Sequence, residues 1–514
     1  MVADWCPAGC SGRAGFCLLS DAVLAGLGIP AVNGYPRGHE QRQSPEKPGA
    51  RDTVPMHNAP QVNTPPKASR HGSRGNRGHR GRGWLVLLAA LAAGPAHGEA
   101  ELPQHDGNQH LGVASCAASS CHGSTRPREA TDVLQNEFFT WHRRDPHAGA
   151  WDALRTERAR AMARRLGVAP AHEAPACLDC HADNVPPDRR GDRFRISDGV
   201  GCEACHGGAG EWIRSHSDSA AGGNGEAPAG MYPTADPAAR TRLCMSCHYS
   251  HPDTPMRHRL MSAGHPPLLF DTDVFTHIQP RHFRADADYR RRNGDRSGLA
   301  AWATGEIVAA DVVLGSLADG VGAGAGMFPE LYYFECDACH HALADDWTPG
   351  TTAGLAPGSL RLADASLRVV AHVLAEIRPA LAQRWSDGVA ALHAATRADG
   401  AAVRDAAARL RAIADTAEQR LADTGMDAAE APGVMRRIVR EGVRTGYRDR
   451  GWAEQAVMAL ASLLAVTEDE GVVGDERRAA LRAALDRMYA VFEEGGYAPA
   501  RFREGLRRFA GALD

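Results

Sequence analysis

Lysine is almost missing from this 514-residue sequence, which contains only Lys47 and Lys67. Beyond residue 67, therefore, no lysine can ligate a cofactor, form a Schiff base or act as a general base. Aromatic residues are also scarce, at 6% of the chain. The net charge of −4 at pH 7 favours neither a nucleic acid partner nor a strongly anionic membrane surface. We expect proteins and small molecules as partners.

The N-terminal region has no apolar run long enough to cross a membrane. Residues 84–93 form an apolar run of only ten residues, preceded by Arg77, Arg80 and Arg82 and followed by residues 96–98. This is the layout of a signal peptide, so we predict a signal over 84–98 with cleavage after Gly98 and a periplasmic mature chain. The alternatives are a weak membrane anchor and a buried helix.

Residues 1–83 have no sustained hydrophobic periodicity and are rich in Gly, Pro, Arg and Asn. A signal peptide is not normally preceded by so long a leader. We interpret this stretch as a mis-assigned start or a disordered leader, with Met56 or a non-Met codon as the true start. Its three cysteines, Cys6, Cys10 and Cys17, then have no functional role.

The other ten of the thirteen cysteines fall in five pairs, each followed directly by histidine, so none is left for a disulfide framework. Two thiols three positions apart can form thioethers with the two vinyl groups of one haem, and the next residue can bring its imidazole to the iron. This spacing predicts covalently attached haem c at four C-x-x-C-H motifs: Cys177/Cys180/His181, Cys202/Cys205/His206, Cys244/Cys247/His248 and Cys336/Cys339/His340.

Zinc sites, iron–sulfur clusters and redox C-x-x-C pairs also use paired cysteines. None of these alternatives requires a histidine after every pair. Four repetitions together with an export signal therefore favour haem.

A fifth pair has wider spacing, with four residues between Cys116 and Cys121 before His122. Attachment requires only that both sulfurs reach the vinyl groups, so we predict a fifth haem here. The alternative is an unmodified pair or a disulfide in an oxidising compartment.

The face of each iron opposite the motif histidine decides its role. A second histidine there makes an electron carrier, whereas an open face can bind a substrate. After residue 98 the chain has fourteen further histidines: His105, His110, His142, His147, His172, His216, His251, His258, His265, His277, His282, His341, His372 and His393.

Three of these histidines are predicted as second ligands. His147 follows the first motif by 25 residues, His216 follows a glycine-rich turn after the third motif, and His265 lies between glycine and proline residues that fix its backbone. For His142, His258 and His282 ligation and a solvated position are equally favoured. His341 follows a motif histidine directly, so it could reach only a neighbouring haem. His372 and His393 lie on predicted helices far from any motif and are interpreted as structural.

The motif order over roughly residues 105–250 resembles the tetrahaem cytochrome c of ammonia oxidisers, the electron acceptor of hydroxylamine oxidoreductase, and its wider multihaem family. The most specific part is the segment 199–207, around Cys202-Glu203-Ala204-Cys205-His206, and Asp145-Pro146-His147-Ala148 also matches the family. The resemblance implies close pairs of haems, most with two histidine ligands and one with five-coordinate iron. It implies His147 as the second ligand of the first haem and matches His216 to a downstream histidine of the family.

Three features depart from this family: the wide first motif, the fifth motif at Cys336 and a long cysteine-free tail. They leave open which haem would be five-coordinate. Before the fifth motif we predict a helix near 298–315 and a glycine-rich loop over 320–326. Tyr332, Tyr333 and Phe334 are expected to pack against a porphyrin face.

From about residue 359 the sequence becomes alanine-rich, with apolar residues at steps of three and four. One such stripe runs from Leu367 to Trp385, with a kink expected at Pro379. Two more helices are predicted, one from Leu481 to Phe492, ended by glycines 495 and 496, and one from Phe502 to Leu513. We interpret the tail as a bundle packed on the haem domain, with a docking or dimer surface as the alternative.

The predicted fold is mainly α with little sheet: a multihaem cytochrome domain over 99–350 and an α-helical domain over 351–514. The predicted function is that of a periplasmic pentahaem c-type cytochrome that carries electrons between redox partner proteins through closely packed haems. The alternative is a reductase or oxidase of a small nitrogen or sulfur oxyanion at one open-faced haem. The lack of lysine disfavours the lysine-ligated haem of pentahaem nitrite reductases.

Overall fold

The computed structural model describes residues 100–128, 133–216, 228–251, 254–284, 298–321, 323–340, 359–493 and 497–514. All of them belong to one compact unit. The predicted leader over 1–83, the predicted signal over 84–98, His341 and glycines 495 and 496 lie outside the described residues.

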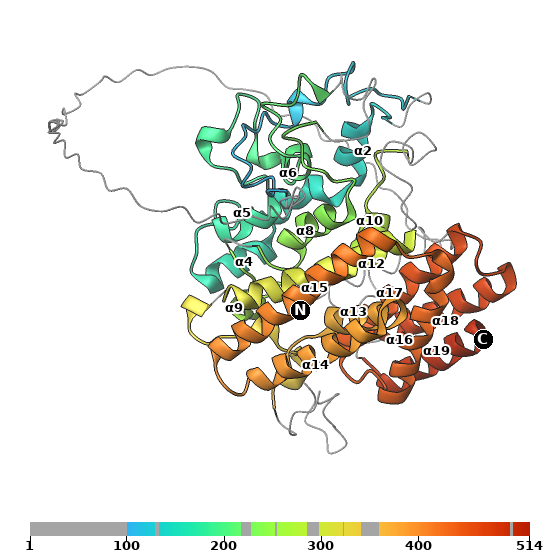
Figure 1. Cartoon of the computed structure of the whole chain (residues 1–514). Helices are drawn as coiled ribbons and strands as arrows, with labels where there is room; N and C mark the ends of the chain where they lie inside the picture. Colours follow the sequence, from blue (N-terminus) through green and yellow to red (C-terminus); the bar gives the residue numbers. More distant parts are fainter. Residues whose placement is uncertain are drawn as a thin grey trace, which may run out of the picture. The chain divides into compact units, whose positions relative to one another are not determined.

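The described residues form helices joined by loops, without a β-sheet among them, which confirms the mainly α prediction. Two isolated bridges, His110 with Arg190 and Phe334 with Leu362, are the extent of β pairing in these parts. The α-helices (Figure 1) are α2 Glu137–Arg144, α3 Ala150–Ala153, α4 Glu157–Leu166, α5 Pro175–His181, α6 Cys202–His206, α8 Pro237–His248, α9 His258–Ser262, α10 Thr272–Ile278, α12 Gly298–Ala318, α13 Ala365–Ile377, α14 Pro379–Ala395, α15 Gly400–Thr424, α16 Ala431–Thr445, α17 Arg450–Asp469, α18 Asp475–Glu493 and α19 Pro499–Leu513.

The helices before residue 290 are short, and three of them carry cysteine pairs. Helices α5 and α8 both begin with proline, whose missing N–H is not needed at the first helical position. The Asp236 carboxylate caps α8 by accepting a hydrogen bond from the Ala239 amide at 2.9 Å. Each of α5, α6 and α8 ends on the histidine of its motif.

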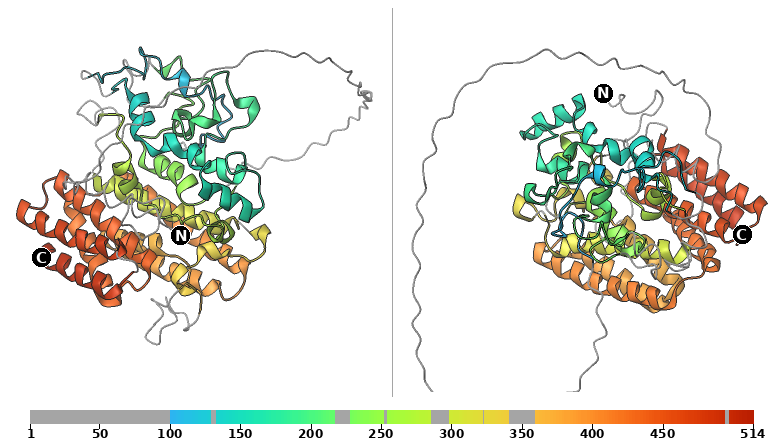
Figure 2. Two further views of the ribbon diagram at one scale, coloured as in Figure 1. Left: turned by 180° about the vertical axis from the view of Figure 1, so that it is seen from behind. Right: turned by 90° about the horizontal axis from the view of Figure 1, so that it is seen from above.

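Helix α12 is the element that joins the two halves of the chain. It packs against α8 and α10 on one side and against α13, α15 and α17 on others (Figures 1 and 2). It is long and apolar enough to cross a membrane, but 72% of its most apolar window is buried inside the protein. Buried Glu306 and Asp311 also lie on it. These features are those of a core helix.

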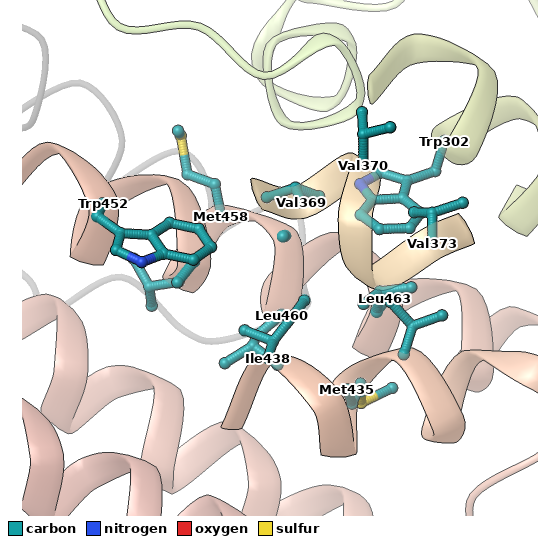
Figure 3. Packing of buried hydrophobic residues seen from close by; sticks show 14 of the residues in the cluster. Trp302, Val369, Val370, Val373, Met435, Ile438, Trp452, Met458, Leu460 and Leu463 are labelled. Carbon is teal, nitrogen blue, oxygen red and sulfur yellow. The ribbon is translucent and has the colours of Figure 1, made fainter. Parts of the chain in front are cut away.

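The largest hydrophobic core extends from Val274 of α10 to Leu513 of α19. Trp302 of α12 lies beside Val370 and Val373 of α13 in this core, as Figure 3 shows. Each such fully buried side chain contributes on the order of 1.5–3 kcal/mol relative to an exposed one. The core therefore includes residues on both sides of the predicted boundary at 350/351, and that boundary stays a prediction.

The predicted helices of the second half are present, with one difference. The stripe from Leu367 to Trp385 was expected on one helix kinked at Pro379, but α13 ends at Ile377 and Pro379 begins α14. Proline is tolerated in a first helical turn, and it disfavours helical backbone in the residue before it. The helix expected near 298–315 is α12, and the last two predicted helices are α18 and α19.

Candidate haem-attachment sites

Each cysteine pair lies on a single turn of backbone. In α5, α6 and α8 the two thiols are three residues apart, so both project from the same side of the helix. The fifth pair begins a short 3₁₀ helix at Cys336, and the His340 amide closes that turn onto the Cys336 carbonyl at 2.8 Å. No disulfide joins any of these ten cysteines, all of which lie within the described residues.

The wider first motif folds back so that its ends meet. The His122 amide donates to the Cys116 carbonyl at 3.2 Å, although four residues separate the thiols. At Gly123 a Cβ atom would lie 1.9 Å from the Ala117 carbonyl oxygen, so only glycine fits after His122. The extra residues are thus accommodated within the loop.

Four of the five motif histidines lie against a second histidine, at nearly the same separation in each case. The distance between ring centroids is 5.9–6.3 Å in all four pairs. The pairs are His122 with His216, His248 with His147, His206 with His282 and His340 with His258.

This separation fits a metal ion between two rings. Metal–imidazole bonds of about 2 Å, with each ring centroid about 1 Å behind its nitrogen, place the centroids roughly 6 Å apart. Three of these histidines have a hydrogen-bond partner on Nδ1. His122 Nδ1 lies 3.0 Å from Glu137 Oε2, and His147 Nδ1 lies 2.9 Å from Asp145 Oδ1. His216 Nδ1 lies 2.8 Å from the Ile213 carbonyl oxygen. Their Nε2 atoms remain for iron, and the partners on Nδ1 fix the ring orientation.

The second motif differs from the other four. The His181 ring has no aromatic ring contact among the described residues, and its Nδ1 is engaged by the Ala150 carbonyl at 3.0 Å. His265 is near enough to interact electrostatically with His181, and the Pro266 carbonyl engages its Nδ1 at 2.8 Å. Both rings therefore have Nε2 free, but they do not form a pair like the others.

Burial keeps several of these imidazoles neutral, which is the form that binds metal. Burial, together with neighbouring histidines, lowers the pKa of His248 to about 3 and the pKa of His206 to about 4. The pKa of His181 is also lowered by burial. At His122, in contrast, the hydrogen bond to Glu137 raises the pKa.

Motifs that are distant in sequence lie side by side. The Cys116 thiol is within hydrogen-bonding reach of Cys202, and the Cys180 thiol of Cys247. These contacts place the first motif next to the third and the second next to the fourth. The fifth adjoins the fourth through tyrosines, since the Tyr332 hydroxyl donates to the Tyr249 carbonyl at 2.8 Å.

Glu203 holds the first and third motifs together. Its carboxylate accepts hydrogen bonds from the amides of Leu111 at 2.7 Å, Gly112 at 2.6 Å and Ala209 at 2.8 Å. His110 lies beside it and bonds Asp183 through Nδ1 at 2.8 Å. Donor atoms of His110, Asp183 and Glu203 lie within 4.8 Å of one another, the size of a metal site. Because the Glu203 oxygens already have three donors, we interpret this group as a cross-link.

The structure differs from the sequence expectations at several histidines. His147, which the resemblance assigned to the first haem, lies against His248 of the fourth motif, and His216 occupies the place beside His122. His258 and His282, left undecided, lie against motif histidines. Sequence distance could not indicate these pairings, because the loops between them set which motif each histidine reaches.

The remaining histidines and aromatic residues have other contacts. His142 packs on Phe138 with ring centroids 5.6 Å apart. His372 pairs with Glu441 at 2.8 Å and His393 with Asp364 at 2.9 Å, as expected for structural histidines. The Tyr333 hydroxyl donates to the Val321 carbonyl at 3.3 Å.

Residues 115–207 match the model of the family described as cytochrome c554 and c-prime. No curated protein matches the chain significantly, and no solved structure does. The matched segment contains the first three motifs, Glu203 and His147. This part of the chain is therefore similar to c-type cytochromes, which carry haem c and take part in electron transfer.

Proposed function

We propose that the chain is a periplasmic pentahaem c-type cytochrome that passes electrons between redox partner proteins. The observation that carries the proposal is the recurrence of one arrangement: four motif histidines, in different parts of the fold, each lie 5.9–6.3 Å from a second histidine ring. A single such pair could be a chance aromatic contact. Four pairs that all include the histidine after a cysteine pair favour two axial ligands on each of four irons.

The protein's own contribution would be attachment, ligation and burial. Haem c supplies reversible one-electron chemistry when bound. The ten cysteines would attach the haems, and His122, His181, His206, His248 and His340 would ligate them. His216, His282, His147 and His258 would be the second ligands of all but the second haem. Glu137 and Asp145 would orient His122 and His147 through their hydrogen bonds and make these imidazoles stronger ligands.

The adjacency of the motifs suggests the order of transfer. The first motif touches the third, and the fourth touches both the second and the fifth. Cys205 and Cys244 are also close enough to interact electrostatically, so the third motif lies close to the fourth. Cys121 and Cys339 are the exposed cysteines of the described residues, so the first and fifth haems would exchange electrons with partners.

Magnetic spectroscopy of the oxidised protein tests the ligand set. Electron paramagnetic resonance should give low-spin signals that account for at least four haems per chain. Covalently bound haem with mainly high-spin signals would contradict the proposed histidine pairs while leaving haem attachment intact.

A second candidate function rests on the second motif. Because His181 lacks the ring partner that the other motif histidines have, its iron is the one on which a small nitrogen or sulfur oxyanion could bind. Addition of nitric oxide or carbon monoxide to the reduced protein distinguishes the two cases. A spectral change in one haem would favour this catalytic alternative, and an unchanged spectrum would indicate that His265 closes the site.

A further inference from the structure

A pair of buried carboxylates lies where α10 meets α12, outside the haem-attachment sites. Asp271 precedes α10 and is 2% exposed, and Glu306 of α12 is 3% exposed. The two carboxyl groups approach within hydrogen-bonding reach of each other. Asp271 Oδ2 and Glu306 Oε2 are nevertheless both buried without a donor. Two ionised carboxylates can only accept, so a proton between them is what would satisfy both oxygens.

Within the described residues no arginine pairs with either carboxylate, although His277 of α10 interacts electrostatically with Asp271. On α10, His277 lies 3.5 Å from the neighbouring Asp273, and Arg240 of α8 acts on that same carboxylate. From α17, Gln455 lies near Glu306 and Ser462 lies near Asp273. From α18, Tyr489 interacts with Asp271. Among the described residues, neither Asp271 nor Glu306 forms an ion pair.

The pair lies close behind the fourth motif. Phe270, next to Asp271 in the chain, has its ring centroid 5.4 Å from that of His248. Phe275 of α10 lies 5.1 Å from the same imidazole. Thr272 of α10 contacts Thr241 of α8, the helix of Cys244, with 3.0 Å between hydroxyl oxygens. A change of charge at His248 would therefore alter the proton affinity of the carboxyl pair, because the protein between them has low polarity and electrostatic interactions are strong there.

We propose that Asp271 and Glu306 form a proton-binding site that takes up one proton when the haem of the fourth motif accepts one electron. This inference rests on the proposed function. The electron comes from the reducing partner protein and ends on the haem iron. The proton comes from water and ends on a carboxylate oxygen of the pair, and reoxidation releases both.

The electrostatic repulsion between the two carboxylates determines whether reduction of the haem favours binding of the first or the second proton. Two carboxylates in contact do not both ionise readily, so the pair already shares one proton before reduction. Burial and the charge of Asp271 raise the pKa of Glu306 accordingly, and burial raises the pKa of Asp271. The added electron favours binding of the second proton, which makes the pair neutral.

Potentiometric titration of the haem-loaded, full-length protein over a range of pH tests this. The midpoint potential of one haem should fall as pH rises, by at most about 59 mV per tenfold change in proton activity. Glu306→Gln should abolish most of that slope. Asp271→Asn provides a second variant with the same expected effect.

The matched control is Glu454→Gln, which removes a buried carboxylate of α17 that is paired with Arg450 at 2.6 Å. This variant should keep the slope. A slope that is absent in the native protein, or that persists unchanged in both pair variants, would overturn the proposal.

Infrared difference spectra between oxidised and reduced protein give a readout that does not depend on potentials. The native protein should show a change in the carbonyl stretch of a protonated carboxylic acid, and Glu306→Gln should lose it. If the native spectrum lacks this band, the proposal fails even though haem is present. Absence of covalent haem would instead overturn the proposed function.

Discussion

At the scale of single residues, a substitution of His216 tests the proposed histidine ligands most directly. This ring lies 6.1 Å from that of His122 and is oriented by the Ile213 carbonyl. His216→Ala should convert one haem from low spin to high spin, because the iron loses its second imidazole. Electron paramagnetic resonance and the absorption spectrum report this directly.

His142→Ala is the matched control for that substitution. The His142 ring packs on Phe138 and contacts none of the motif histidines. The control should keep every haem low-spin. Unchanged spin states in His216→Ala would contradict the pairing of His216 with His122.

Glu335 makes the stability of the protein depend on pH. Burial raises the pKa of this side chain from 4.5 to about 8, although Arg361 lies 3.3 Å away. In the unfolded chain Glu335 ionises near its ordinary pKa. Its contribution to stability is therefore present below about pH 4.5 and is lost as pH rises towards about 8.

Glu335→Gln removes this titration from both states, so the free energy of unfolding of the variant should fall less than that of the parent between pH 5 and 8. Chemical denaturation at several pH values measures the difference. Identical pH profiles for the two proteins would show that Glu335 is ionised in the folded state.

Residue types and spacing predicted the cysteines and motif histidines, because attachment to one haem is a local requirement. They did not predict which second histidine reaches which motif. His282 follows the third motif by 76 positions yet lies against its histidine, His206. That pairing depends on where the chain after α10 lies relative to α6, which sequence spacing does not describe.

At the scale of elements, glycines in α19 provide a test of helix packing. A Cβ atom at Gly505 would lie 2.5 Å from Met488 Cγ of α18, whereas a Cβ at Gly511 meets nothing within 4 Å. Gly505→Ala should destabilise the protein by roughly 1–3 kcal/mol through overpacking. Gly511→Ala should be neutral or stabilising by up to about 1 kcal/mol, because alanine favours helix.

Both variants can be compared by thermal or chemical unfolding of the haem-loaded protein. Equal effects of the two substitutions would mean that α18 and α19 do not pack as described.

A buried arginine connects the fifth motif to the helical bundle. Arg361 lies between Glu335, next to Cys336, and the carboxylates of Asp364 and Asp449. The Glu335 amide also donates to the Arg361 carbonyl at 3.0 Å. Arg361→Met would leave Glu335 and Asp449 buried without their cation, whereas Asp364 would keep Arg368 and His393. The expected loss of stability is about 3–5 kcal/mol.

The control is Arg436→Met, since Arg436 pairs with Asp514 on the surface at 3.6 Å. It should leave the unfolding midpoint unchanged. If Arg361→Met also left the unfolding midpoint unchanged, the cluster around Arg361 would not be what anchors the fifth motif.

Hydrophobic periodicity predicted the regions of α13, α14, α18 and α19, because each of these helices buries one apolar face. It did not single out α15, α16 and α17, and it predicted one kinked helix at Pro379 where two helices are present. Helix α8 of the first half lacks such a stripe. Its buried residues are of both kinds, Leu243 and Met245 beside Thr241 and Ser246, while its two cysteines are half-buried.

At the scale of the whole molecule, α12 makes the haem-binding part and the bundle a single structure. It contacts α8, which carries the fourth motif, and α15 of the bundle. The bundle in turn holds the fifth motif, since Asp337 accepts a hydrogen bond from the Arg450 amide at 3.0 Å. We infer that the second half of the chain positions the fifth haem beside the fourth.

The number of covalently bound haems is the most direct test of the central claim. Intact mass spectrometry of the purified chain, together with a pyridine haemochrome assay, counts haems per polypeptide. A pentahaem cytochrome should have a mass equal to that of the polypeptide plus five haems, and five haems per chain by absorbance. A mass equal to that of the bare polypeptide, or one lacking the haem at Cys116 and Cys121, would contradict the pentahaem proposal.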